Sequence, residues 1–150
     1  MNSSRNYYCL LILNLGLFCS LGCGSDVPFD IVPVNGKLTY EDGSLIPADD
    51  ITVIFNPVDP PRDGKMVAPG GRTNVNVADG TFSSVTSYRP NDGVILGQHK
   101  IVVITSKNNA KGRPGSGNLT AAKYRKQATT PLEMEITSSN QFLEIKVSKK

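Results

Sequence analysis

The strongest structural signal in the chain is the run Gln98-His99-Lys100-Ile101-Val102-Val103-Ile104-Thr105-Ser106. Successive side chains of a β-strand point to opposite faces of the sheet. Ile101, Val103 and Thr105 would therefore share one face, and Val102 and Ile104 would share the other. Because both faces are apolar, the run predicts a strand in the centre of a sheet.

On both sides of this run, short apolar–polar stretches alternate with turn signals, a pattern typical of an all-β domain. The remaining candidate strands are Val34–Tyr40, Ile51–Asn56, Arg72–Val77, Thr81–Ser87, Leu132–Thr137 and Gln141–Ser148. With the first run, they predict a single sandwich of about seven strands.

Glycine pairs mark the expected turns. Asp-Gly occurs at Asp42-Gly43, Asp63-Gly64, Asp79-Gly80 and Asp92-Gly93, and Asn35-Gly36 is a related pair. Glycine adopts positive φ without a steric penalty, and Asp or Asn tolerates the left-handed region, so such pairs favour tight turns. Calcium binding is the alternative, but these aspartates are scattered and lack the spacing of an EF-hand loop.

The first 22 of the 150 residues are typical of an export signal. Arg5 is the only charged residue among the first 25, an apolar stretch follows at 7–18, and small residues come next. The stretch is shorter than the roughly 20 residues of a membrane-spanning helix. A single transmembrane anchor and a buried N-terminal helix are the alternatives. The remaining residues fit one domain, which excludes a protein with many membrane spans.

All three cysteines lie in or next to this signal, at Cys9, Cys19 and Cys23. Ser20-Leu21-Gly22-Cys23 resembles a bacterial lipobox, which implies that Cys23 is acylated and becomes the first residue of the mature chain. Ordinary signal-peptidase cleavage is the alternative, because the same residues are small at the required positions. The expected organisation is therefore a signal peptide at 1–22, a lipidated tether at 23–33 and a β-sandwich domain at 34–150. Gly24 implies placement at the outer membrane or cell surface; without acylation the domain would be secreted.

Two long loops are expected, Pro57–Gly71 with four prolines and Lys107–Thr130 with many cations. Between residue 93 and the C-terminus there are ten basic and three acidic residues. The second loop is expected to be a solvated loop whose charge keeps the tethered protein soluble, and binding of anionic lipid, an acidic polysaccharide or nucleic acid is the functional alternative. Its candidate binding residues are Lys107, Lys111, Arg113, Lys123, Arg125 and Lys126. Nucleic acid is not expected, since the chain is exported and only Tyr124 is available for stacking on a base.

Strand and turn motifs follow one another in a characteristic order: Val34-Asn35-Gly36-Lys37-Leu38-Thr39-Tyr40, Ile51-Thr52-Val53-Ile54-Phe55-Asn56-Pro57, Asp79-Gly80-Thr81-Phe82, Gly97-Gln98-His99-Lys100-Ile101-Val102-Val103, Thr130-Pro131-Leu132-Glu133-Met134-Glu135-Ile136 and Asn140-Gln141-Phe142-Leu143-Glu144-Ile145. The series is similar to small bacterial lipoproteins with a carboxypeptidase-regulatory-like, or transthyretin-like, domain. The resemblance spans Val32 to Val147 and implies a seven-stranded Greek-key sandwich. It implies little about activity.

Catalytic groups are scarce. His99 is the only histidine and lies in a predicted strand, so neither a histidine dyad nor a His-pair metal site can form. Asp49 and Asp50 are adjacent and should splay apart. Glu133 and Glu135 should share the solvent face of their strand. We therefore expect no catalytic residue, no metal and no cofactor.

The resulting hypothesis is a non-enzymatic, membrane-tethered binding or structural module of the cell envelope. Its expected partners are membrane lipid through Cys23 and a polysaccharide or an envelope protein through the loops. The alternative is an accessory domain that positions a separate hydrolase or transporter subunit.

Overall fold

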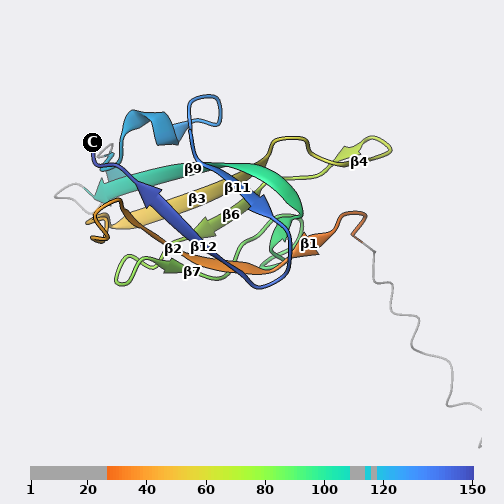
Figure 1. Ribbon diagram of the computed structural model, residues 1–150, viewed down its shortest axis with the longest axis horizontal. Coiled ribbons are helices and arrows are strands. Elements are labelled where there is room, and N and C mark those ends of the chain that lie inside the picture. The colour runs from red at the N-terminus through yellow and green to blue at the C-terminus, as the bar shows by residue number, and fades with distance from the viewer. Residues whose placement is uncertain (1–26, 109–113, 116–117) are drawn as a thin grey trace, which may run out of the picture.

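A computed structural model describes residues 27–108, 114–115 and 118–150 (Figure 1). This part of the chain forms twelve strands and one short 3₁₀ helix: β1 (Ile31–Val32), β2 (Val34–Tyr40), β3 (Asp50–Pro57), β4 (Arg62–Asp63), β5 (Met66–Val67), β6 (Gly71–Asn74), β7 (Thr81–Phe82), β8 (Val94–Ile95), β9 (Gly97–Asn108), β10 (Pro114–Gly115), η1 (Ala122–Arg125), β11 (Glu133–Ile136) and β12 (Gln141–Val147). The all-β prediction is confirmed. The count of about seven strands is too low, because five additional two-residue strands are too short to show alternation.

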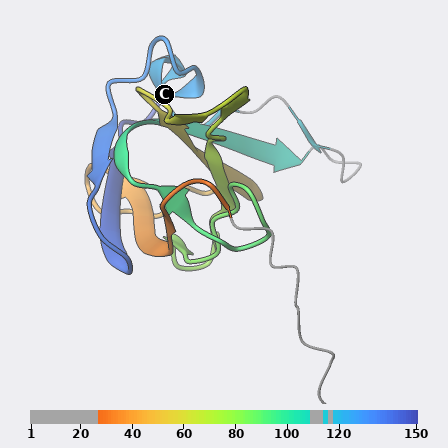
Figure 2. The ribbon, with the colours of Figure 1, turned by 90° about the vertical axis from the view of Figure 1, so that its right-hand side faces the viewer.

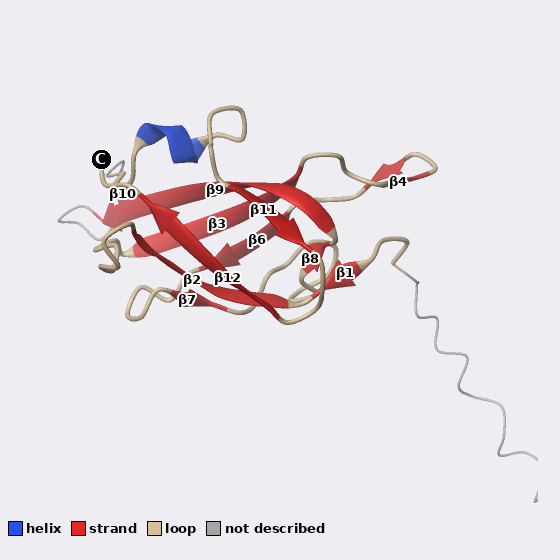
Figure 3. Ribbon diagram, in the orientation of Figure 1, coloured by secondary structure: helices blue, strands red, loops and turns tan. Residues whose placement is uncertain are grey.

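Two sheets stack to form the sandwich (Figure 3). The larger has the order β10-β9-β3-β6, with β11 also paired to β9, and the smaller has the order β12-β2-β7. Strands distant in sequence are neighbours, as in Greek-key sandwiches. In the larger sheet, Val53 of β3 faces Val103 of β9. In the smaller sheet, β12 runs parallel to β2 and pairs Ile145 with Leu38.

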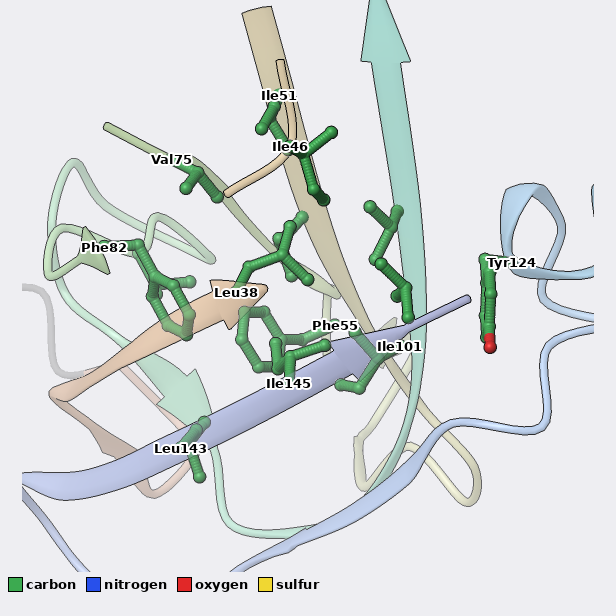
Figure 4. Close-up of a cluster of buried hydrophobic side chains, with 14 of the residues drawn as sticks. Leu38, Ile46, Ile51, Phe55, Val75, Phe82, Ile101, Tyr124, Leu143 and Ile145 are labelled. Atoms are coloured by element: carbon green, nitrogen blue, oxygen red, sulfur yellow. The ribbon is translucent and has the colours of Figure 1, made fainter. Parts of the chain in front are cut away.

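The hydrophobic core lies between the two sheets (Figure 4). Phe55 and Ile101 enter it from the larger sheet, and Leu38, Leu143 and Ile145 enter it from the smaller one. The central position of β9 is confirmed, since it pairs with β3 on one side and with β11 and β10 on the other. On its outer face Val102 is buried but Ile104 is 42% exposed, so this face is only partly covered.

The predicted Asp-Gly turns are present at positive φ, with 83° at Gly43, 57° at Gly64, 79° at Gly80 and 114° at Gly93. In one of them, Asp79 accepts hydrogen bonds of 2.8 Å from the Thr81 amide and 2.7 Å from its hydroxyl. The Asn35-Gly36 pair was wrongly predicted to be a turn, because it lies inside β2. Glycine is needed there for space: a Cβ atom at Gly36 would overlap the Leu143 carbonyl and the Phe82 ring.

The first described residues pack against the domain rather than standing apart from it. β1 pairs with β8, and Phe29 forms a second small core with Ala68 and Ile95, which Val27 and Ile31 partly cover. The region expected to be a tether is therefore folded from Val27 onward. No helix in the described ranges is long and apolar enough to cross a membrane.

Candidate anion-binding site

Helix η1 is held at the sandwich by its one buried residue. Tyr124 is 2% exposed and joins the main core. Its hydroxyl oxygen lies 3.1 Å from the Ser148 hydroxyl and accepts a 3.1 Å hydrogen bond from the Ser148 amide. The Ala121 amide donates to the Ser148 carbonyl at 3.2 Å. With Tyr124 turned inward, the flanking Lys123 and Arg125 are left exposed to solvent.

The segment that follows η1 is closed into a compact turn. The Thr129 hydroxyl donates to the Lys123 carbonyl at 2.8 Å, and the amides of Thr129 and Thr130 donate to the Lys126 carbonyl at 3.1 and 3.0 Å. The buried Thr130 hydroxyl then donates to the Ile101 carbonyl of β9 at 2.6 Å. The turn is thus fixed at both ends, to β12 through Tyr124 and to β9 through Thr130.

Helix η1 and this turn form a hollow of about 600 Å³ that is open to solvent. It is lined by Ala122, Lys123, Arg125, Lys126 and Thr129. Three of the five lining residues are cationic and none is acidic. The salt bridges among described residues lie elsewhere, between Lys100 and Glu133 at 3.5 Å and between Lys149 and Asp42 at 2.8 Å. We call the five lining residues the η1 hollow.

The ammonium group of Lys123 makes a cation–π contact with the aromatic ring of Tyr124. Its ammonium nitrogen lies 4.9 Å from the centroid of the Tyr124 ring. Burial raises the pKa of Tyr124, but hydrogen bonds from Ser148 and the positive charge of Lys123 outweigh it and hold that pKa below its usual 10.0.

The structure brings together three of the six cations expected to bind an anion, namely Lys123, Arg125 and Lys126. Lys107 lies on β9 opposite Gly115 of β10 and does not line the hollow. Lys111, Arg113 and the predicted lipidation residue Cys23 lie outside the described residues. Thr129 was not among the candidates. It carries no charge, and only its hydrogen bond to Lys123 shows its place in the hollow.

The only histidine is part of the core. His99 is fully buried, its Nε2 lies 2.8 Å from the Ile95 carbonyl, and its ring meets the Phe55 ring edge-on at 6.3 Å. Burial lowers the pKa of His99, and the hydrogen bond to Ile95 opposes this only in part. The imidazole is therefore neutral at physiological pH and out of reach of a substrate.

The carboxylates are dispersed over the surface. Glu133 and Glu135 are exposed on the same face of β11, as expected, while Ile136 behind them is buried. Asp49 accepts a 2.7 Å hydrogen bond from the Asn108 amide. Among the described residues, no three His, Cys, Asp or Glu side chains are close enough to hold a metal ion together.

Comparisons with protein-family models, with curated proteins and with solved structures found no match. The chemistry of the site therefore rests on its own geometry. A solvent-open hollow with three cations and a hydroxyl, on a turn held by hydrogen bonds at both ends, can bind a multiply charged anion by charge-assisted hydrogen bonds.

Proposed function

We propose that this chain is a membrane-tethered, extracytoplasmic lipoprotein whose β-sandwich binds an anionic polysaccharide of the cell envelope through the η1 hollow. The observation that carries this proposal is the grouping of Lys123, Arg125 and Lys126 around one hollow that has no carboxylate among its lining residues. The export signal and the lipobox-like segment ending at Cys23 support the tether. The resemblance to transthyretin-like lipoproteins supports the same assignment.

A polysaccharide suits the shape of the hollow better than a small anion does. The hollow is open to solvent, so one phosphate-sized ion would stay largely hydrated there. A chain of uronic-acid units would place several carboxylates over the three cations at once. Its sugar hydroxyls could also bond to the Thr129 hydroxyl. The protein acts as a binding module and carries out no reaction.

The decisive experiment is binding of the full-length protein to polygalacturonate, an acidic polysaccharide, with neutral dextran as the comparison. We expect binding to polygalacturonate alone, with the Kd rising steeply between about 50 mM and about 500 mM salt, because salt screens exposed charges. Lys123→Gln, Arg125→Gln and Lys126→Gln in one variant should weaken binding at least about tenfold, as expected for loss of several hydrogen bonds to charged groups.

A matched control removes three exposed cations elsewhere, by Lys37→Gln, Arg72→Gln and Lys146→Gln. This variant has the same net charge as the first, so it should keep most of the affinity if the η1 hollow is the site. Equal weakening of binding in both variants would show that the loss of affinity comes from the lower net charge alone, and it would contradict the proposal. Intact mass and N-terminal sequencing of protein extracted from its native membranes test the tether separately. The expected mature chain begins at an acylated Cys23.

A further inference from the structure

A small hairpin projects from one end of the sandwich, well beyond both sheets (Figure 1). It consists of β4 and β5, with Arg62 opposite Val67 and Asp63 opposite Met66. Its foot is closed by a 2.9 Å hydrogen bond from the Ala68 amide to the Pro61 carbonyl. Neither strand pairs with a main sheet, so the hairpin contributes little to the core.

The loop that carries this hairpin exposes apolar side chains. Val58 is 46% exposed, Met66 43% and Val67 41%. The charges of the same loop cancel, because Asp59 and Asp63 oppose Arg62 and Lys65. The exposed Met and Val side chains give this projecting loop apolar surface, and its charged residues leave no net charge that would favour an ionic partner.

The chain enters the domain beside this hairpin. Ala68, at the foot of the hairpin, packs with Phe29 and Ile95 in the second core, which Val27 partly covers. The amide of Leu96 donates to the Asp30 carbonyl at 3.0 Å and fixes the entering segment further. Two perpendicular views place β1 and the hairpin at the same end of the molecule (Figures 1 and 2).

This arrangement limits how far the hairpin can stand from a membrane. Cys23 precedes Val27 by four residues. A fully extended chain spans at most about 3.5 Å per residue, so an acylated Cys23 keeps Val27 within about 14 Å of the lipid. The end of the sandwich that carries the hairpin therefore faces the bilayer, whereas η1 lies toward the other end (Figure 1).

We propose that the β4–β5 hairpin is a second membrane contact, which inserts Met66 and Val67 among the lipids beside the acyl anchor. This inference rests on the proposed tether. A lipid anchor attached at one residue leaves the domain free to rotate about its link. A second contact at the same end restricts that rotation and turns the η1 hollow away from the bilayer, where an envelope polysaccharide can reach it. Because the loop has no net charge, insertion depends on apolar contact and not on anionic lipid.

The chain contains no tryptophan, so one introduced indole reports its own position. The test uses full-length Met66→Trp protein, extracted from membranes and reconstituted into phosphatidylcholine vesicles with or without brominated acyl chains. We expect blue-shifted emission and at least about twofold quenching by the brominated lipid. The matched control is Val77→Trp, at a residue that is 37% exposed in the turn between β6 and β7, at the opposite end of the sandwich (Figure 1). Its emission should be unquenched.

The possible results test the lipid tether at Cys23 and the membrane contact of the hairpin separately. Quenching of Met66→Trp alone, unchanged at high salt, supports the hairpin contact. An unquenched indole in acylated protein overturns the hairpin contact and leaves the tether standing. Quenching in protein whose mass shows no acyl chain supports the hairpin and overturns the tether.

A second variant, Met66→Asp with Val67→Asp, should transfer to acceptor vesicles at least about fivefold faster, while an unchanged melting temperature shows that the domain is intact. Transfer at the wild-type rate would also contradict insertion.

Discussion

The hydroxyl oxygen of Tyr124 accepts a 3.1 Å hydrogen bond from the amide of Ser148, just beyond the last residue of β12. This bond joins the only helix of the described chain to the end of the strand that completes the smaller sheet. Because Tyr124 also belongs to the main core, the positions of Lys123 and Arg125 depend on the packing of the sandwich. The cations of the η1 hollow are thus presented from a rigid support, which reduces the entropy lost when an anion binds.

Tyr124→Phe should separate this support from the packing of the ring. The variant keeps the buried ring but removes the hydroxyl that receives the Ser148 amide, so we expect the free energy of unfolding to fall by about 1 kcal/mol. Affinity for polygalacturonate should fall with it, because η1 loses a link to β12. Urea unfolding and titration calorimetry measure the two effects. Unchanged affinity in the less stable variant would show that the hollow does not need this bond.

His99→Phe should remove a specific part of the acid sensitivity of the fold. The pKa of the buried imidazole is lowered in the folded state, so below about pH 6.5 the unfolded chain binds the proton more readily than the folded one. Wild-type stability should therefore decline as the pH falls from about 6.5 toward the lowered pKa, by at most about 1.4 kcal/mol per pH unit. Chemical unfolding at several pH values should show a flat profile for the phenylalanine variant over this range. Because His99 is the only histidine, a decline of equal size in both proteins would assign the effect elsewhere.

Much of the sandwich could be predicted from local pattern. The alternation in Val34–Tyr40 matches β2 residue for residue, and the apolar run around Ile101 matches the centre of β9. The two-residue strands could not be predicted, because their pairing depends on neighbours distant in the chain, as in Ile31 with Ile95. Gly36 was misinterpreted for a related reason. Its local signal indicates a turn, whereas the close approach of Leu143 and Phe82 requires glycine inside a strand.

The candidate site was only partly predictable. Charge counting identified the basic loop but could not separate Lys107 from the cations that gather in the η1 hollow. That separation depends on Tyr124, whose partner Ser148 is 24 residues away in the sequence. Likewise, the sequence does not show that the β4–β5 hairpin lies next to the segment by which the chain enters the domain. That position follows from the packing of Ala68 against Phe29.

Gly36→Ala should test the close contact between β2 and its neighbours. The added methyl group would overlap the Leu143 carbonyl and the Phe82 ring, and backbone cannot move aside easily. We expect a loss of about 1–3 kcal/mol in unfolding free energy, as for other overpacked cores. Gly36→Ala combined with Phe82→Leu should recover only part of it, because the carbonyl remains. Thermal and chemical unfolding of both variants measure the loss, and full tolerance of alanine would disprove this contact.

Thr129→Val should distinguish the placement of the cations from their charge. The substitution keeps Lys123, Arg125 and Lys126 but removes the hydroxyl that donates to the Lys123 carbonyl at 2.8 Å, so the turn around the hollow loosens. We expect the Kd for polygalacturonate to rise about threefold to tenfold, consistent with the loss of about 1 kcal/mol from one hydrogen bond. The dependence of log Kd on log salt should stay at the wild-type slope, because all three charges remain. The triple glutamine variant should instead flatten that slope.

Thr137→Val, at an exposed threonine after β11, is the matched control and should leave both the Kd and the slope unchanged. A flattened slope in Thr129→Val would mean that the hydroxyl affects which cations reach the ligand. Wild-type binding would remove Thr129 from the site.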